Sequence, residues 1–139
     1  MSIGTRLRRR KELHFVPEHE SMSDILEDHG LAALGDAYVN LVYSLALSRK
    51  LGKPVGRKVD SSTLASALRK ADLRKFLPSR TDRHKQADAA ESLIVYAWLT
   101  GKISLEETIR IVEKEESVED AFSLLLQTVS KSVGGKSAT

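Results

Sequence analysis

Apolar residues recur along this chain at the three- and four-residue spacing of amphipathic helices, and the pattern is strongest in two stretches. The first stretch, residues 31–50, is broken by Gly52 and Pro54. The second stretch, residues 82–100, is dense in apolar side chains and ends at Gly101. Both stretches are predicted to be long helices. The repeating positions of the first are Leu31, Leu34, Tyr38, Leu41, Val42 and Leu45.

Capping residues predict shorter helices around these two. A side-chain oxygen just before a helix accepts hydrogen bonds from the free N–H groups of the first turn, and a Ser followed three residues later by Glu does so reciprocally. The predicted shorter helices are residues 23–28, stopped by Gly30; 62–71, capped by Asp60 or Ser61; 104–116, opened by Ser104 and Glu107; and 118–131, capped by Ser117.

These elements predict an all-α protein with one helical domain over residues 23–131. Residues 1–22 are expected to form a basic, flexible or extended arm, and residues 132–139 a flexible tail. The length of 139 residues suits a single domain, and the lack of cysteine excludes disulfides and thiolate metal sites. We see no apolar run of the ~20 residues that cross a bilayer and no secretory signal, so we expect a cytoplasmic protein without a membrane partner.

Charge is distributed unevenly, although the net charge is only +3. Between Arg49 and Lys85, basic residues outnumber acidic ones by nine, and between Gly101 and Asp120 acidic residues outnumber basic ones by four. A segregated basic segment is typical of a polyanion-binding protein. A solvated helix surface gives the same pattern, so charge alone leaves both interpretations open.

Carboxylates interrupt both long predicted helices. Asp36 lies in the first, and Asp88 and Glu91 lie in the second at i, i+3 spacing, which places their Cβ atoms about 5–6 Å apart. Burying an unpaired carboxylate costs several kcal/mol, so a cation usually neutralises such groups. Together these acids would form an all-oxygen site suited to Mg²⁺ or Mn²⁺, although each alone is more simply a solvent-facing residue. The small residues nearby would let two helices approach closely: Gly35, Ala37, Ala87, Ala89 and Ala90.

The order and spacing of these motifs resemble the catalytic domain of the ribonuclease III family. Leu34-Gly35-Asp36-Ala37 is similar to the first family signature, and Asp88-x-x-Glu91-Ser-Leu-Ile, some fifty residues later, is similar to the second. The stretch from Gly30 to Tyr38 is most similar to the compact Mini-ribonuclease III branch, which has no separate double-stranded-RNA-binding domain. The resemblance covers roughly residues 30–107.

The resemblance implies an all-helical, homodimeric endoribonuclease that binds Mg²⁺ or Mn²⁺ through Asp36, Asp88 and Glu91. Its implied substrate is double-stranded or structured RNA, for example ribosomal RNA precursors, with a ribosomal association and no DNA partner. Ala32 stands where larger relatives have a metal-binding Glu, which the compact branch also lacks. Ala33 replaces a bulky aromatic residue that helps relatives to dimerise. Asn40 could hydrogen-bond to Asp36, but we favour an ordinary surface role for it.

The candidate RNA-phosphate contacts are basic residues on either side of the third predicted helix, and a solvent-facing surface is the alternative for each: Arg57, Lys58, Arg80, Arg83 and Lys85. Two other functions stay open for the whole chain. One is a non-catalytic RNA- or ribosome-binding protein with the same fold. The other is a helical domain that contacts a protein through the acidic residues 106–120.

Overall fold

The computed structural model describes residues 13–134, and these residues form helices without strands. The helices are α2 (Met22–Leu26), α3 (His29–Leu51), α4 (Ser61–Lys70), α5 (Arg83–Leu99), α6 (Leu105–Lys114) and α7 (Val118–Gly134), with a 3₁₀ turn, η1, at Arg74–Phe76. The predicted all-α class is therefore confirmed. The N-terminal Arg6–Arg10 run and most of the predicted tail lie outside the described residues.

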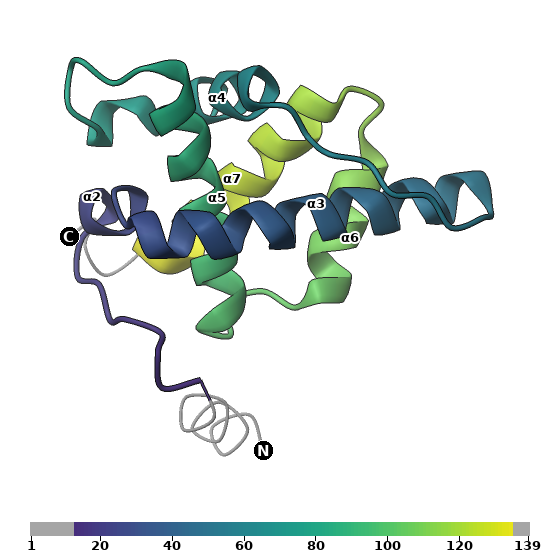
Figure 1. Ribbon diagram of the computed structural model, residues 1–139, viewed down its shortest axis with the longest axis horizontal. Helices are drawn as coiled ribbons and strands as arrows, with labels where there is room; N and C mark the ends of the chain where they lie inside the picture. Colours follow the sequence, from purple (N-terminus) through teal and green to yellow (C-terminus); the bar gives the residue numbers. More distant parts are fainter. Residues whose placement is uncertain (1–12, 135–139) are drawn as a thin grey trace.

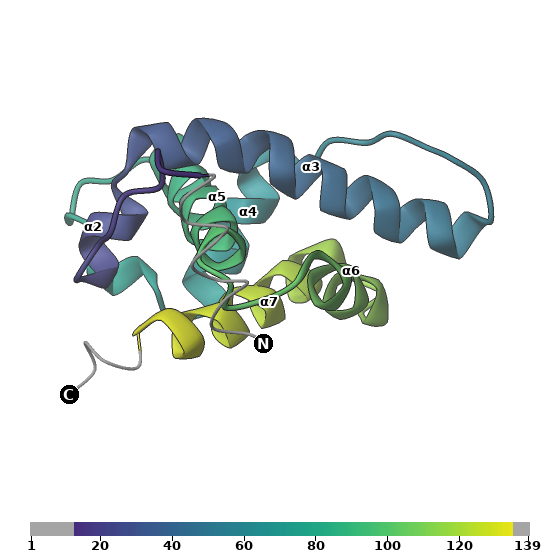
Figure 2. The same cartoon turned by 90° about the horizontal axis from the view of Figure 1, so that it is seen from below.

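Helix α5 lies at the centre and contacts α2, α3, α4 and α7 (Figures 1 and 2). Most of its length is buried, including an uninterrupted stretch from Ala89 to Ala97. Helix α3 crosses one side of α5, and α6 and α7 lie on the other side in Figure 2. Asp88 and Glu91 belong to the part of α5 that faces α3.

Side-chain caps start the helices as their chemistry predicts. Asp60 accepts a hydrogen bond from the Thr63 N–H at 2.8 Å, and Ser104 forms the predicted capping box with Glu107. Gly30 was expected to stop the short helix before it, which is wrong: Gly30 lies in the first turn of α3. The Asp28 carboxylate caps that turn by accepting from the Leu31 N–H at 2.9 Å, so the glycine is tolerated inside the helix.

The segment before α2 packs against the helices. The His19 backbone N–H donates to the Tyr96 hydroxyl at 3.1 Å, and the His19 ring lies 2.8 Å from the Asp28 carboxylate. Leu13 and Val16 pack against the hydrophobic core. Of the predicted N-terminal arm, the described part is thus attached to α5 and to the start of α3.

Helix α3 is long and apolar enough, judged by length and composition alone, to cross a membrane. Buried core helices meet the same criterion, and α3 packs one face against α5 and α6. That face includes Leu31, Tyr38, Val39 and Val42. This packing, together with the exposed apolar side chains of Leu34 and Leu41, accounts for the apolar content of α3.

Candidate functional site

Helices α3 and α5 cross in direct backbone contact at Gly35. A Cβ atom added to Gly35 would collide with the backbone carbonyl group of Glu91 and lie 3.0 Å from the Glu91 Cβ. The predicted close approach of small residues is therefore confirmed at Gly35, whereas Ala37 is exposed. Because Asp36 follows Gly35, this crossing brings the carboxylates of Asp36 and Glu91 together from distant parts of the sequence.

A second contact fixes the start of α3 against α5. Ser92, which is fully buried, donates its hydroxyl to the Asp28 backbone carbonyl at 2.9 Å. The Asp28 carboxylate is held by the Leu31 N–H and by His19, and these bonds keep its pKa below the ordinary value although burial opposes them. Helix α5 thus meets α3 and its cap at two consecutive residues, Glu91 against Gly35 and Ser92 against Asp28.

The three predicted carboxylates differ in their exposure. Glu91 is only 6% exposed, Asp88 is half-buried and Asp36 is exposed. Burial, then a hydrogen bond to the Asp36 carboxyl, and then the negative charges of Asp36 and Asp88 raise the pKa of Glu91 to about 8. The hydrogen bond raises the pKa because a protonated Glu91 carboxyl can donate it to Asp36, whereas an ionised one cannot.

As the side chains lie, no group of three or more His, Asp or Glu residues within residues 13–134 is arranged to hold a metal ion. Glu91 nevertheless interacts electrostatically with both Asp36, to which it is hydrogen-bonded, and Asp88. The donor set consists of oxygen atoms, which fits Mg²⁺ or Mn²⁺. To bind a cation, Glu91 has to release its proton, because a metal ligand must be deprotonated.

Asn40 has a different role from the one we favoured. Its side-chain amide donates to Asp36 Oδ1 at 3.2 Å, and its carbonyl oxygen accepts from the Val59 N–H at 2.8 Å. The interpretation of Asn40 as an ordinary surface residue is therefore wrong. The signal available in the sequence was its position one helical turn after Asp36, which alone does not reveal the contact with Val59.

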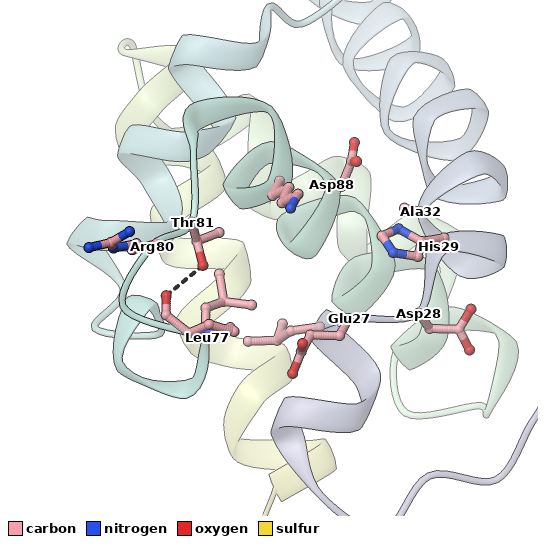
Figure 3. A pocket seen from close by; sticks show the side chains of 11 residues that line it. Glu27, Asp28, His29, Ala32, Leu77, Arg80, Thr81 and Asp88 are labelled. Atoms are coloured by element: carbon pink, nitrogen blue, oxygen red, sulfur yellow. Dashed lines mark hydrogen bonds between the residues drawn. The ribbon is translucent and has the colours of Figure 1, made fainter.

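A cavity of about 220 Å³ opens beside Asp88, between the start of α3 and the segment before α5. Figure 3 shows Ala32 and His29 on one side of this cavity and Arg80 on the other. Ala32, which stands where larger relatives of the resembled family have Glu, thus lies in the cavity wall. The cavity combines apolar residues with the basic side chains of Arg80 and Lys85 and the acidic side chains of Glu27, Asp28 and Asp88.

Internal pairing removes several cations from the strongly basic segment. Arg49 lies 3.2 Å from the Glu113 carboxylate, and Lys70 pairs with Glu119 and Asp120. Part of the acidic segment therefore neutralises part of the basic one. Other side chains of the segment bond locally: Lys75 to Asp72, Arg69 to Gln86 and Ser66, and Arg74 to the carbonyls of Leu77 and Ser79.

The five predicted RNA contacts are exposed cations whose side chains form no ion pair or hydrogen bond within the described part of the chain: Arg57, Lys58, Arg80, Arg83 and Lys85. Arg57 and Lys58 lie in the loop between α3 and α4. Arg80 and Lys85 border the cavity beside Asp88. Lys53, which belongs to the basic segment but was not among the predicted contacts, is an exposed cation of the first loop, and within residues 13–134 its side chain forms no ion pair or hydrogen bond.

Comparison with known proteins is consistent with this arrangement. No curated protein matches the chain. A family model described as ribonuclease III matches residues 29–134, a span that includes all three carboxylates and ends with α7. The chain therefore belongs to the ribonuclease III family, as the sequence motifs predicted.

Proposed function

We propose that this protein is a metal-dependent endoribonuclease that hydrolyses phosphodiester bonds in double-stranded or structured RNA. The observation that carries the proposal is the buried carboxyl of Glu91, hydrogen-bonded to Asp36 at the α3–α5 crossing and coupled to Asp88. Ionising a buried acid that is held among other acids carries an energetic cost, which a bound cation would offset. Members of the ribonuclease III family generally use a divalent metal, and this cluster of acids would bind it.

The carboxylates of Asp36, Asp88 and Glu91 would hold Mg²⁺ or Mn²⁺. When bound, such a metal activates a water for attack on phosphorus and stabilises the departing 3′ oxygen. Gly35 contributes by letting α3 and α5 approach closely enough for acids of both helices to share a site. Burial of Glu91 keeps this carboxyl out of bulk water, so its charge is stabilised only when a cation is close.

The exposed, unpaired cations support RNA as the partner. Arg80 and Lys85 beside the cavity, and Arg57 and Lys58 in the neighbouring loop, would neutralise phosphates of a duplex. Double-stranded RNA is recognised mostly by shape, phosphates and 2′-hydroxyls, and the last of these distinguish it from DNA. The resemblance to the compact branch favours precursor ribosomal RNA as substrate, ribosomal association and a cytoplasmic location.

An exposed apolar stripe on α3 supports a homodimer. Leu34 and Leu41 are 40% and 49% exposed, and Ala33 and Ala37 lie exposed between and beside them on the same helix. These positions recur at helical spacing on the face away from α5. A second copy packed on this stripe would place two carboxylate clusters near one duplex, one for each strand.

A cleavage assay tests the proposal directly. Purified protein incubated with a labelled RNA duplex should cut it only when Mg²⁺ or Mn²⁺ is present, and Asp36→Asn and Asp88→Asn should abolish cutting. Asp72→Asn is the matched control, because Asp72 is exposed, lies away from the cluster and has φ 62°, a conformation that Asn tolerates. Cleavage that survives in both site variants, or that needs no metal, would overturn the proposal.

A non-catalytic RNA- or ribosome-binding protein is the second candidate, and Ala32 favours it, because the cavity wall carries a methyl group where larger relatives have a metal ligand. Salt-sensitive RNA binding without cutting would support this candidate. The double variant Arg57→Ala, Lys58→Ala should then lower RNA affinity and reduce the salt-dependence slope by about 2, whereas Lys70→Ala, whose lysine is already paired, should change it less.

A further inference from the structure

The Asn40 side chain bridges Asp36 and the loop that carries Arg57 and Lys58. The Asn40 amide nitrogen lies 3.2 Å from Asp36 Oδ1, and its carbonyl oxygen lies 2.8 Å from the Val59 nitrogen. A backbone N–H can only donate and a carboxylate can only accept, so these two partners fix which end of the amide points where. Asn40 therefore cannot rotate without losing both bonds.

Two serines continue this connection along α3. Ser44 hydrogen-bonds to both the backbone N–H and the carbonyl of Arg57, at 2.9 and 3.1 Å. Ser48 does the same with Val55, at 3.0 and 3.2 Å. Residues Asn40, Ser44 and Ser48 are thus spaced four apart on one face of α3, and they meet every second residue of the loop.

The spacing explains why the loop follows the helix so closely. Four residues of α-helix rise about 6 Å, and two residues of extended chain span about 6.6 Å. The three hydrogen-bonded pairs between α3 and the loop therefore stay in register. Val55–Val59 consequently runs antiparallel to α3, and Asp36 is the next position along the same face. The loop that presents Arg57 and Lys58 is anchored at its far end beside the carboxylate cluster.

We propose that Asn40 is a positioning residue that holds Asp36 in the orientation needed for metal binding and links it to the RNA-contacting loop. The inference rests on the proposed function, because it assigns Asn40 a role toward the metal that Asp36 would hold. Asp36 is exposed and would otherwise be free to adopt several rotamers. Asn40 restricts it from one side, while Glu91 binds it from the other.

The experiment compares Asn40→Ala and Asn40→Leu with Ser44→Ala. The serine variant removes the hydrogen bonds between α3 and Arg57 but leaves those of Asp36 intact. Mn²⁺ affinity is measured by isothermal titration calorimetry without RNA, and amide exchange at Val59 and Arg57 is measured by NMR. Both Asn40 variants should bind Mn²⁺ about 10-fold more weakly, the usual effect of removing a group that orients a ligand. Raising Mn²⁺ about 10-fold should restore their cleavage rate.

Ser44→Ala should keep the Mn²⁺ affinity of the wild type, while exchange at Arg57 becomes faster and RNA binding weaker. The inference is overturned if the Asn40 variants bind Mn²⁺ as the wild type does, or if Ser44→Ala weakens Mn²⁺ binding equally. Leu has the same number and branching of side-chain heavy atoms as Asn, so a defect confined to Asn40→Ala would indicate lost packing and would also overturn it. A wild type that binds no Mn²⁺ refutes the proposed function itself, and the role of Asn40 with it.

Discussion

Raising the pH from 5 to 9 should destabilise the folded protein through one buried carboxyl, that of Glu91. Its pKa rises from the ordinary 4.5 to about 8 on folding, mainly through burial and then through Asp36 and Asp88. Between these two values the folded protein binds more protons than the unfolded chain. The free energy of unfolding therefore falls as the pH rises across this window and becomes level above about pH 8.

The size of the effect follows from the same two pKa values. Each pH unit inside the window costs about 1.4 kcal/mol, so the complete loss is about 5 kcal/mol, of which about 3 kcal/mol has been lost at pH 7. The carboxyls of Asp28, Asp60 and Glu107 have lowered pKa values and act in the opposite direction, but only in more acidic solution. Glu91 should thus dominate these carboxyl contributions above pH 5.

Urea unfolding at pH 5, 7 and 9 in the presence of a chelator measures this slope. Glu91→Gln keeps the shape of the side chain and its ability to donate to Asp36 but cannot ionise, so it should remove most of the slope and exceed the wild type in stability at pH 9. Glu116→Gln, at an exposed position, is the matched control and should keep the slope. A wild type of constant stability from pH 5 to 8, or a Glu91→Gln protein with an unchanged slope, would refute the reasoning.

Three further predictions concern packing, assembly and capping. Gly35→Ala should destabilise the protein by about 2–3 kcal/mol in urea unfolding, because its methyl group meets the Glu91 backbone, whereas Gly56→Ala meets open space and should have little effect. Leu41→Glu should convert the proposed dimer into monomers in sedimentation experiments, whereas the similarly exposed Leu124→Glu should not; a variant that still dimerises would exclude this face. Ser104→Ala should cost about 1 kcal/mol of unfolding free energy, because the capping box at the start of α6 is lost, and an unchanged denaturation midpoint would contradict this.

Local chemistry made most helix starts predictable from the sequence. Asp60 and Ser104 cap their helices because a side-chain oxygen satisfies free N–H groups a few residues away, an interaction that sequence spacing alone describes. Gly30 misled the prediction, since a glycine near a helix start is tolerated when a cap precedes it. The Asp28 cap supplies that condition at α3.

The spacing of residues in the sequence could not predict the contacts between distant segments of the chain. The family motifs predicted that Asp36 would meet Glu91, but the burial of Glu91 depends on how α5 is surrounded by four other helices. Charge counts likewise could not show that the Lys70 side chain is paired with Asp120 while the Arg57 guanidinium forms no ion pair in the described chain. Such pairs join residues that are neighbours only after folding.

The contact between Gly35 and Glu91 has a consequence for the kinetics of folding. Asp36 and Glu91 belong to helices far apart in the sequence, and they meet only where the two backbones touch. An isolated α3 or α5 therefore carries no complete acidic cluster. A divalent cation that needs both helices would leave the early steps of folding unchanged and would chiefly slow unfolding, because its binding energy is lost when the crossing opens.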